Sequence, residues 1–149
     1  MEIQLLEEFK YNEFNPIISA AMTAQGAATV AVGLKTRQKK LKALALPSAF
    51  SAFLGITEPA IFGVNLRYFK PFVCGLIGGA AGGFLASLLH LKASGMAITV
   101  LPGMLLFIED IGQLPLYILV LAVSFAVGFV LTWFFGYSDK MAEEIREAK

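Results

Sequence analysis

Three long stretches without any aspartate, glutamate, lysine or arginine most constrain the fold of this chain. They cover residues 16–34, 71–91 and 111–138. Crossing the hydrocarbon core of a membrane takes roughly 20 helical residues, and each stretch is close to or above that length. Only 15% of the residues are charged, against about a quarter in an ordinary soluble domain. The sequence therefore predicts an all-α integral membrane protein, with transmembrane helices over about 16–34, 71–91 and 113–135.

The charges beside these stretches predict the orientation of the helices. Residues 35–42 carry five basic side chains and no acidic one, which favours the cytoplasmic side of the membrane. The segment ahead of the first helix is acidic and suits the outer side. We therefore expect residues 16–34 to run inward, 71–91 outward and 113–135 inward, which leaves the polar tail 138–149 in the cytoplasm.

Residues 43–66 permit two interpretations. The stretch is long enough to span a membrane at about 1.5 Å per helical residue, but its far end is basic again at Arg67 and Lys70. A full crossing would place these charges outside, against the usual bias. Proline and glycine also interrupt the stretch, as in two short half-helices joined at a tip. We predict a re-entrant helical hairpin over about 43–66; an ordinary span with one buried glutamate is the alternative.

Residues 93–108 are a second interrupted stretch, too short to span a membrane comfortably. We expect another dip or an interfacial piece there. The next two residues, Glu109 and Asp110, should then lie on the outer side.

Glu58 stands within the first interrupted stretch, in the motif Gly55-Ile-Thr57-Glu58-Pro59. A carboxylate at membrane depth is costly, so an intramembrane glutamate indicates a functional site. Pro59 suits the first turn of a helix, and a helix beginning near Thr57 or Glu58 would direct the positive end of its dipole at the carboxylate. An ionised carboxylate only accepts hydrogen bonds, so it suits a hydroxyl-rich neutral solute such as a sugar; it equally allows a proton or a sodium ion. In the structural alternative, Glu58 pairs with backbone groups or with Arg67 and braces the tip.

Four other residues complete the set of candidate substrate-binding positions. Thr57 adds a hydroxyl that donates or accepts, and the backbone near Gly55 offers freed polar groups. Gln25 in the first helix can either hydrogen-bond to a neighbouring helix or line the path of the solute. Asn65, near the end of the interrupted stretch, is the remaining candidate.

Several other kinds of function are disfavoured. One cysteine and one histidine leave no cysteine- or histidine-rich metal site, and a net charge of +1 offers no basic stripe for nucleic acid. No Ser-His-Asp, Cys-His or paired-carboxylate arrangement is apparent, so we expect no catalytic residue, metal or cofactor in this chain. The glycines of residues 75–83 lack the lysine of a phosphate-binding loop, and their small-xxx-small spacing predicts close helix packing instead.

Residues 55–67, Gly-Ile-Thr-Glu-Pro-Ala-Ile-Phe-Gly-Val-Asn-Leu-Arg, resemble the signature of the membrane (IIC) component of bacterial phosphotransferase system (PTS) sugar transporters. Within the glucose superfamily, the resemblance is closest to the sucrose, trehalose and β-glucoside branch. The flanks agree in order: Ala-Gln-Gly-Ala-Ala at 24–28, the basic run at 35–42, Lys-Pro-Phe at 70–72 and Gly-Gly-Ala-Ala-Gly-Gly at 78–83. The likeness covers roughly residues 11–137.

The resemblance implies a multi-pass, dimeric permease of the bacterial inner cell membrane. Such a permease binds a sugar at a site that includes the motif glutamate, here Glu58, and carries it inward by alternating access. A IIB domain, charged from IIA, then phosphorylates the sugar from a phosphocysteine. This chain holds neither the IIB cysteine motif nor the IIA histidine, so it would be one part of a protein-phosphocysteine–sugar phosphotransferase complex without a phosphoryl-carrying residue of its own.

The resemblance further implies the C-terminal portion of a IIC, as a truncated gene product, a split subunit or a fragment. Its partners would be the sugar, the IIB and IIA domains, the remaining N-terminal IIC helices and membrane lipid, with no nucleic acid. We therefore expect the sugar-binding portion of a PTS permease, with sucrose favoured over trehalose or a β-glucoside. The alternatives are an ion- or proton-coupled carrier fragment that uses Glu58, and a membrane remnant without transport.

Overall fold

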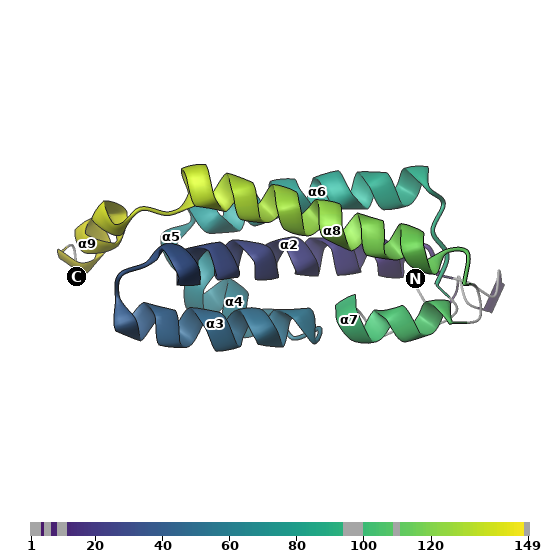
Figure 1. The fold of residues 1–149 in the computed structure, drawn as a ribbon, viewed down its shortest axis with the longest axis horizontal. Coiled ribbons are helices and arrows are strands. Elements are labelled where there is room, and N and C mark those ends of the chain that lie inside the picture. The colour runs from purple at the N-terminus through teal and green to yellow at the C-terminus, as the bar shows by residue number, and fades with distance from the viewer. Residues whose placement is uncertain (1–3, 5–6, 9–11, 94–99, 109–110, 148–149) are drawn as a thin grey trace.

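Three long helices form the frame of the protein (Figure 1). The structure is a computed structural model that describes residues 4, 7–8, 12–93, 100–108 and 111–147. The long helices are α2 (Phe14–Lys35), α6 (Lys70–Leu88) and α8 (Leu114–Leu131), the last continued by a π-helical segment, η3 (Thr132–Gly136). Each is long and apolar enough to cross a membrane. The predicted all-α membrane class is confirmed, and within the described residues the only β pairing is an isolated bridge between Asn12 and Ala93.

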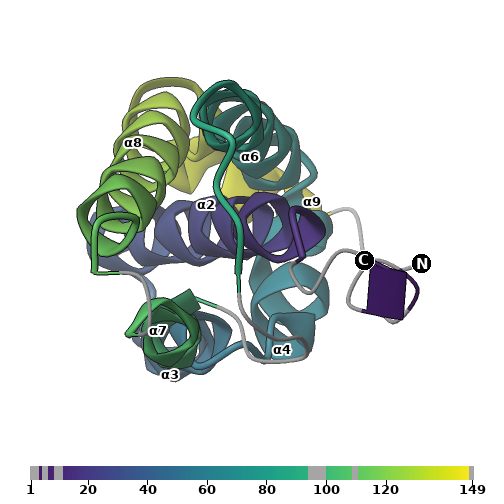
Figure 2. The same ribbon diagram turned by 90° about the vertical axis from the view of Figure 1, so that its right-hand side faces the viewer.

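Helix α2 lies at the centre of the molecule. In the end-on view of Figure 2 it lies between the α6–α8 pair and a second group made of α3, α4 and α7. The most apolar part of α2 is 67% buried, whereas the most apolar part of the continuous helix formed by α8 and η3 is only 28% buried. Small side chains let this helix be enclosed, because residues such as Ala20, Ala24 and Ala27 allow neighbouring helices to approach closely.

Glycines of α6 bring the three long helices together. A Cβ placed on Gly78 would lie 2.7 Å from the backbone nitrogen of Gly128 in α8, and one on Gly79 would lie 2.9 Å from the Cα of Ala21 in α2. Both distances are shorter than side chains tolerate, so these positions need glycine. The packing role predicted from the spacing of the glycines is therefore confirmed.

Residues 39–68 form a helical hairpin against the C-terminal half of α2. The first arm is α3 (Lys39–Phe53), and the second arm is α4 (Glu58–Ala60), a π-helical segment η1 (Ile61–Asn65) and α5 (Leu66–Tyr68). The arms run antiparallel, because Leu41 near the base packs with Tyr68 and Leu44 lies beside Gly63. The hairpin shape agrees with the predicted half-helices, while its position in a membrane stays a prediction.

A short helix continues the line of α3 along the other half of α2 (Figure 1). It comprises α7 (Val100–Gly103) and the 3-10 segment η2 (Met104–Phe107). The predicted interruption over 93–108 is thus helical at 100–107, and Val100 is tied to α2 by a bond from its N–H to the Ser19 hydroxyl (3.2 Å). Residues 94–99, Glu109 and Asp110 lie outside the described residues.

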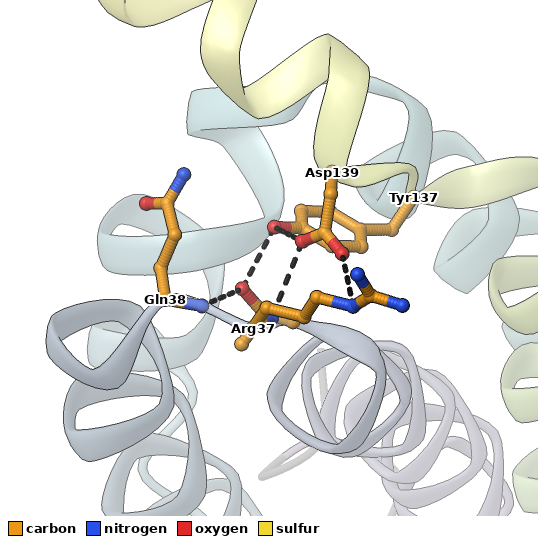
Figure 3. Close-up of polar contacts among 5 residues, drawn as sticks. Arg37, Gln38, Tyr137 and Asp139 are labelled. Carbon is orange, nitrogen blue, oxygen red and sulfur yellow. Dashed lines mark hydrogen bonds and ion pairs between the residues drawn. The ribbon is translucent and has the colours of Figure 1, made fainter.

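The base of the hairpin and the C-terminal segment meet at one end of the protein. Figure 3 shows the C-terminal polar cluster, in which Arg37, Gln38, Tyr137 and Asp139 are labelled and Thr36 is bonded to Gln38 and Tyr137. The Tyr137 hydroxyl donates to Thr36 Oγ1 (2.8 Å), and Arg37 donates its backbone N–H to Asp139 Oδ1 (3.2 Å). These bonds fix the start of α9 (Asp139–Glu147), the described part of the predicted tail; residues 148–149 lie outside it.

Candidate functional site

The tip of the hairpin is a helix C-cap that depends on Gly55. This residue has a φ of 95°, which L side chains rarely adopt. Its N–H donates to the Ala52 carbonyl and the Ile56 N–H donates to the Ser51 carbonyl, both at 3.0 Å. This is the Schellman arrangement, which satisfies the last carbonyls of α3. The Ser51 hydroxyl also donates to the Ile56 carbonyl (3.1 Å), so the turn is closed from both sides.

The second arm begins at the motif glutamate, as the position of Pro59 predicted. Helix α4 begins at Glu58 with Pro59 in its first turn, and the Ile61 N–H donates to the Thr57 carbonyl (2.9 Å). Proline is favoured there because the first helical N–H groups lack an intrahelical partner anyway. Tip and helix start together place Thr57 and Glu58 side by side at the turn of the chain.

The Glu58 side chain is exposed on the surface of the helical bundle. Among the described residues it forms no ion pair and no side-chain hydrogen bond. The structure therefore does not contain the alternative arrangement, in which Glu58 would pair with Arg67 and brace the tip. A carboxylate facing lipid at membrane depth would cost about 3 kcal/mol or more, so in a membrane Glu58 requires water, ligand or further protein against it.

A cavity of about 430 Å³ opens between α2, α6 and the second hairpin arm, and we call it the α2–α6 groove. Thr57 and Gln25 supply its polar side chains. The other lining residues are apolar or glycine: Ile17, Ala21, Met22, Ile61, Phe72, Gly75, Leu76, Gly79 and Ala80. A cavity of this size is within the range of small-molecule sites. Glu58 does not itself line the groove, but it directly follows the lining residue Thr57 in the chain.

A buried hydrogen-bond network holds the hairpin against α2. Asn65, which is fully buried, donates from Nδ2 to the Gln25 carbonyl (2.9 Å) and to Gln25 Oε1 (2.8 Å). The Thr29 hydroxyl shares its one proton between Asn65 Oδ1 (3.0 Å) and the Gln25 carbonyl (2.9 Å), and Gln25 Nε2 donates to the Phe72 carbonyl of α6 (3.2 Å). We call Gln25, Thr29 and Asn65 the amide network. Its hydrogen bonds connect α2, η1 and α6, whose apolar surroundings offer few other polar groups to bond with.

The five predicted site residues therefore divide into two groups. Thr57 and Glu58 lie at the tip, where Gly55 shapes the turn, and Gln25 reaches the groove from α2. Asn65 instead has its amide engaged within the amide network. For Gln25 both interpretations from the sequence apply, because it lines the groove and also hydrogen-bonds across helices. Direct contact of any of these residues with a solute stays a prediction.

Sequence reasoning missed Thr29 and the carbonyl of Phe72. The position of Thr29, one helical turn after Gln25 on α2, could have placed both side chains on one face. Nothing in the sequence indicated a role for the Phe72 carbonyl. It can accept the Gln25 bond only because Gly75 has no side chain and leaves room for Gln25 against α6. A Cβ at Gly75 would lie 2.7 Å from the Gln25 side chain.

The chemistry available at the tip is hydrogen bonding and charge stabilisation. Within the described residues, no group of three or more histidine, cysteine, aspartate or glutamate side chains could hold a metal ion. Glu58 offers carboxylate oxygens as acceptors and Thr57 offers a hydroxyl, while Gln25, whose Oε1 and Nε2 are already bonded to Asn65 and Phe72, offers only the second N–H of its amide. Such a set suits recognition of a neutral polar molecule beside an apolar wall.

Comparisons with known proteins agree with this description. A sequence model of the family described as "Phosphotransferase system, EIIC" matches residues 5–79. The chain is 47% identical over 122 residues to a PTS system sucrose-specific EIIBC component of Salmonella typhimurium, which covers 82% of this chain and 26% of the relative. It is 31% identical over 134 residues to a trehalose-specific EIIBC component of Escherichia coli strain K12 (90% and 28%).

A third relative is a beta-glucoside-specific EIIBCA component of Bacillus subtilis strain 168, which is 38% identical over 131 residues (83% of this chain and 20% of the relative). The chain thus spans about a quarter of the length of the curated relatives it matches. No solved structure gives a significant match.

Proposed function

Because the chain belongs to the phosphotransferase system EIIC family, we propose that it supplies the glutamate-bearing part of a sugar site in a bacterial membrane permease. The Glu58 carboxylate would accept hydrogen bonds from sugar hydroxyls, and Thr57 and Gln25 would shape the adjoining groove. Gly55 and Asn65 would position these groups through the tip turn and the amide network. Sucrose is the favoured sugar, because the relatives with 47% and 49% identity are sucrose-specific EIIBC components.

The observation that carries this proposal is the unpaired Glu58 carboxylate at the start of α4. It is held at a turn closed by backbone bonds, it makes no ion pair among the described residues, and it adjoins a groove with two polar side chains. A structural glutamate would be expected to have a partner, since an unpaired charge in a membrane is costly. A carboxylate left open in a rigid frame is instead suited to an external ligand.

The exposed position of Glu58 also supports a site that is completed by other protein. The relatives are several times longer than this chain and are named EIIBC components and, in one case, an EIIBCA component. We infer that the remaining EIIC helices cover the tip, and that the IIB domain phosphorylates the sugar after transfer to the cytoplasm. This complete unit would be a homodimer in the inner membrane. The residues described here would serve binding and translocation, without carrying a phosphoryl group.

Equilibrium binding of labelled sugars tests the proposal. Sucrose, trehalose and a β-glucoside are titrated against the detergent-purified chain, alone and reunited with the N-terminal EIIC helices of a sucrose-specific relative. Glu58→Gln should weaken binding about tenfold or more at every pH, because it removes hydrogen bonds to a charged acceptor. Glu144→Gln, an exposed carboxamide substitution on α9, is the matched control and should change nothing.

Two outcomes would contradict the proposal. If neither form binds any of the three sugars, this segment carries no sugar site. If Glu58→Gln leaves affinity intact but removes its pH dependence, Glu58 is a proton carrier, and the chain belongs to an ion- or proton-coupled mechanism instead.

A further inference from the structure

A second cavity lies at the base of the hairpin, at the end of the protein opposite the hairpin tip. It has a volume of about 660 Å³ and is bordered by three cationic side chains, Lys39 and Lys40 from α3 and Arg67 from α5. Leu41, Leu44 and Tyr68 form its apolar wall. We call it the basic cavity. Lys39 and Arg67 are far apart in sequence and are brought together only because the two arms of the hairpin return to the same end.

The three cations of the basic cavity lack counter-ions among the described residues. Lys39, Lys40 and Arg67 form no ion pair with any described residue, and no acidic side chain of the described chain borders the cavity. The neighbouring Arg37 differs, since it lies 3.9 Å from the Asp139 carboxylate. Three like charges around one cavity repel one another, and their mutual repulsion is relieved when an anion binds between them.

The position of the two lysines strengthens this argument. They occupy the first turn of α3, where the helix dipole favours acidic residues, and that turn contains none. The Gln38 side chain does not cap the helix, so the first N–H groups of α3 have no side-chain acceptor. Both the side chains and the backbone at this point are therefore donors without a matching side-chain acceptor in the described part of the chain.

From this arrangement we propose that the basic cavity binds a phosphate-bearing anion, with Lys39, Lys40 and Arg67 as the recognising side chains. The planar guanidinium of Arg67 can donate two parallel hydrogen bonds to phosphate oxygens, and each lysine contributes a compact charge. The volume of the cavity accommodates a phosphate ester as well as the bare anion. The same chemistry would recognise a soluble phosphate ester or the headgroup of an anionic phospholipid. The site is separate from the Glu58 tip and does not depend on the sugar proposed above.

Binding of defined phosphate probes to the full chain tests this site. In detergent, inorganic phosphate and glucose 6-phosphate are titrated by isothermal titration calorimetry. In a parallel arm, the chain is placed in nanodiscs that contain phosphatidylglycerol or phosphatidylcholine, and native mass spectrometry measures which lipid it retains. Binding in the first arm identifies a soluble ester as the ligand; preference for phosphatidylglycerol in the second arm alone identifies the headgroup.

Two triple variants separate a built site from general positive charge. Lys39→Gln, Lys40→Gln and Arg67→Gln together should weaken phosphate binding about tenfold or more. The matched control combines Lys42→Gln, Lys70→Gln and Lys140→Gln, which removes three exposed charges that do not border the cavity. This control should stay within about twofold of the wild type. All six side chains are exposed, so circular dichroism should show unchanged helicity in both variants.

The proposal would be overturned by either of two results. One is the absence of any phosphate binding together with equal retention of the two lipids. The other is an equal loss in both triple variants, which would mean that the charge of this end, and not the basic cavity, attracts the anion. Arg67→Lys adds a finer test, because it keeps the charge but removes the two parallel N–H donors of the guanidinium. It should weaken phosphate binding by less than the triple variant does.

Discussion

Removing the Asn65 amide should weaken the attachment of the hairpin to α2 and so lower the stability of the protein. Asn65 makes three hydrogen bonds, two donated to Gln25 and one accepted from Thr29. Side-chain hydrogen bonds between membrane helices average about 0.6 kcal/mol each, so three give roughly 2 kcal/mol. In Asn65→Ala the Gln25 Oε1 atom also loses its partner at a position that is only 4% exposed. An unsatisfied buried acceptor adds about 1–3 kcal/mol, and we expect a total loss of about 3–5 kcal/mol of unfolding free energy.

The assay is equilibrium unfolding of the purified chain in mixed micelles, followed by circular dichroism and by fluorescence of Trp133. Thr23→Ala is the matched control. Thr23 is also buried (4% exposed), but its hydroxyl donates only to the Ser19 carbonyl within α2 (2.7 Å). Because that bond connects no two elements, its loss should cost about 1 kcal/mol or less.

A double-mutant cycle identifies the network as the cause. Gln25→Leu removes the acceptor that Asn65→Ala would leave unpaired, so the second substitution should cost less in that background. We expect a coupling energy of about 1 kcal/mol or more between the two positions. The reasoning would be refuted if Asn65→Ala cost no more than Thr23→Ala, or if the two substitutions were additive within about 0.5 kcal/mol.

Three further predictions concern the tip, the helix packing and the C-terminal polar cluster. Gly55→Ala should lower stability by about 1–2 kcal/mol, because the residue has a φ of 95°; Gly55→Asn should lose less in the same unfolding assay, and equal losses would argue against conformational strain. Gly78→Ala should lower the unfolding free energy by about 1–3 kcal/mol through overpacking, because the new Cβ would lie 2.7 Å from a backbone atom of Gly128. Gly63→Ala should cost far less, because the nearest atom to its Cβ would be 3.7 Å away. Similar costs for the two variants would contradict the packing account. Burial and, in part, the negative charge of Asp139 raise the pKa of Tyr137 from 10.0 to about 12, despite an opposing hydrogen bond to Thr36. The neutral phenol therefore stabilises the fold fully below pH 10, and this stabilisation is lost as the pH rises from about 10 to about 12. An absorbance titration should show tyrosinate forming near the upper end of this range, and Tyr137→Phe should remove that transition. Its persistence in the variant would assign it to another tyrosine.

Local patterns in the sequence predicted much of the fold. Three charge-free stretches were enough to place the long helices, because length and the absence of charge decide whether a helix can lie in a membrane. Pro59 predicted the start of α4, since proline tolerates few positions in a helix. The spacing of the α6 glycines predicted close packing for the same kind of local reason.

Contacts between distant residues could not be predicted in this way. Asn65 was a candidate for direct solute contact, but its amide is used by Gln25 and Thr29, which lie 36–40 positions away. The π-helical segment η1 ends at Asn65; such segments have no clear sequence pattern and often occur at functional sites. The bond between Tyr137 and Thr36 joins residues 101 positions apart. Each of these features depends on how the helices pack, which periodicity alone does not specify.

The position of the hairpin tip along α2 has an electrical consequence. Thr57 lines the α2–α6 groove together with Ala21, Met22 and Gln25, so the start of α4 lies beside the middle of α2. In a membrane crossed by α2, an ionised Glu58 would lie about halfway through the voltage drop. Moving one charge across the whole drop involves about 2.3 kcal/mol per 100 mV, so carrying this carboxylate to either face involves roughly half of that. A permease that moves its hairpin with Glu58 ionised would therefore respond to membrane potential, even when the solute that it carries is uncharged.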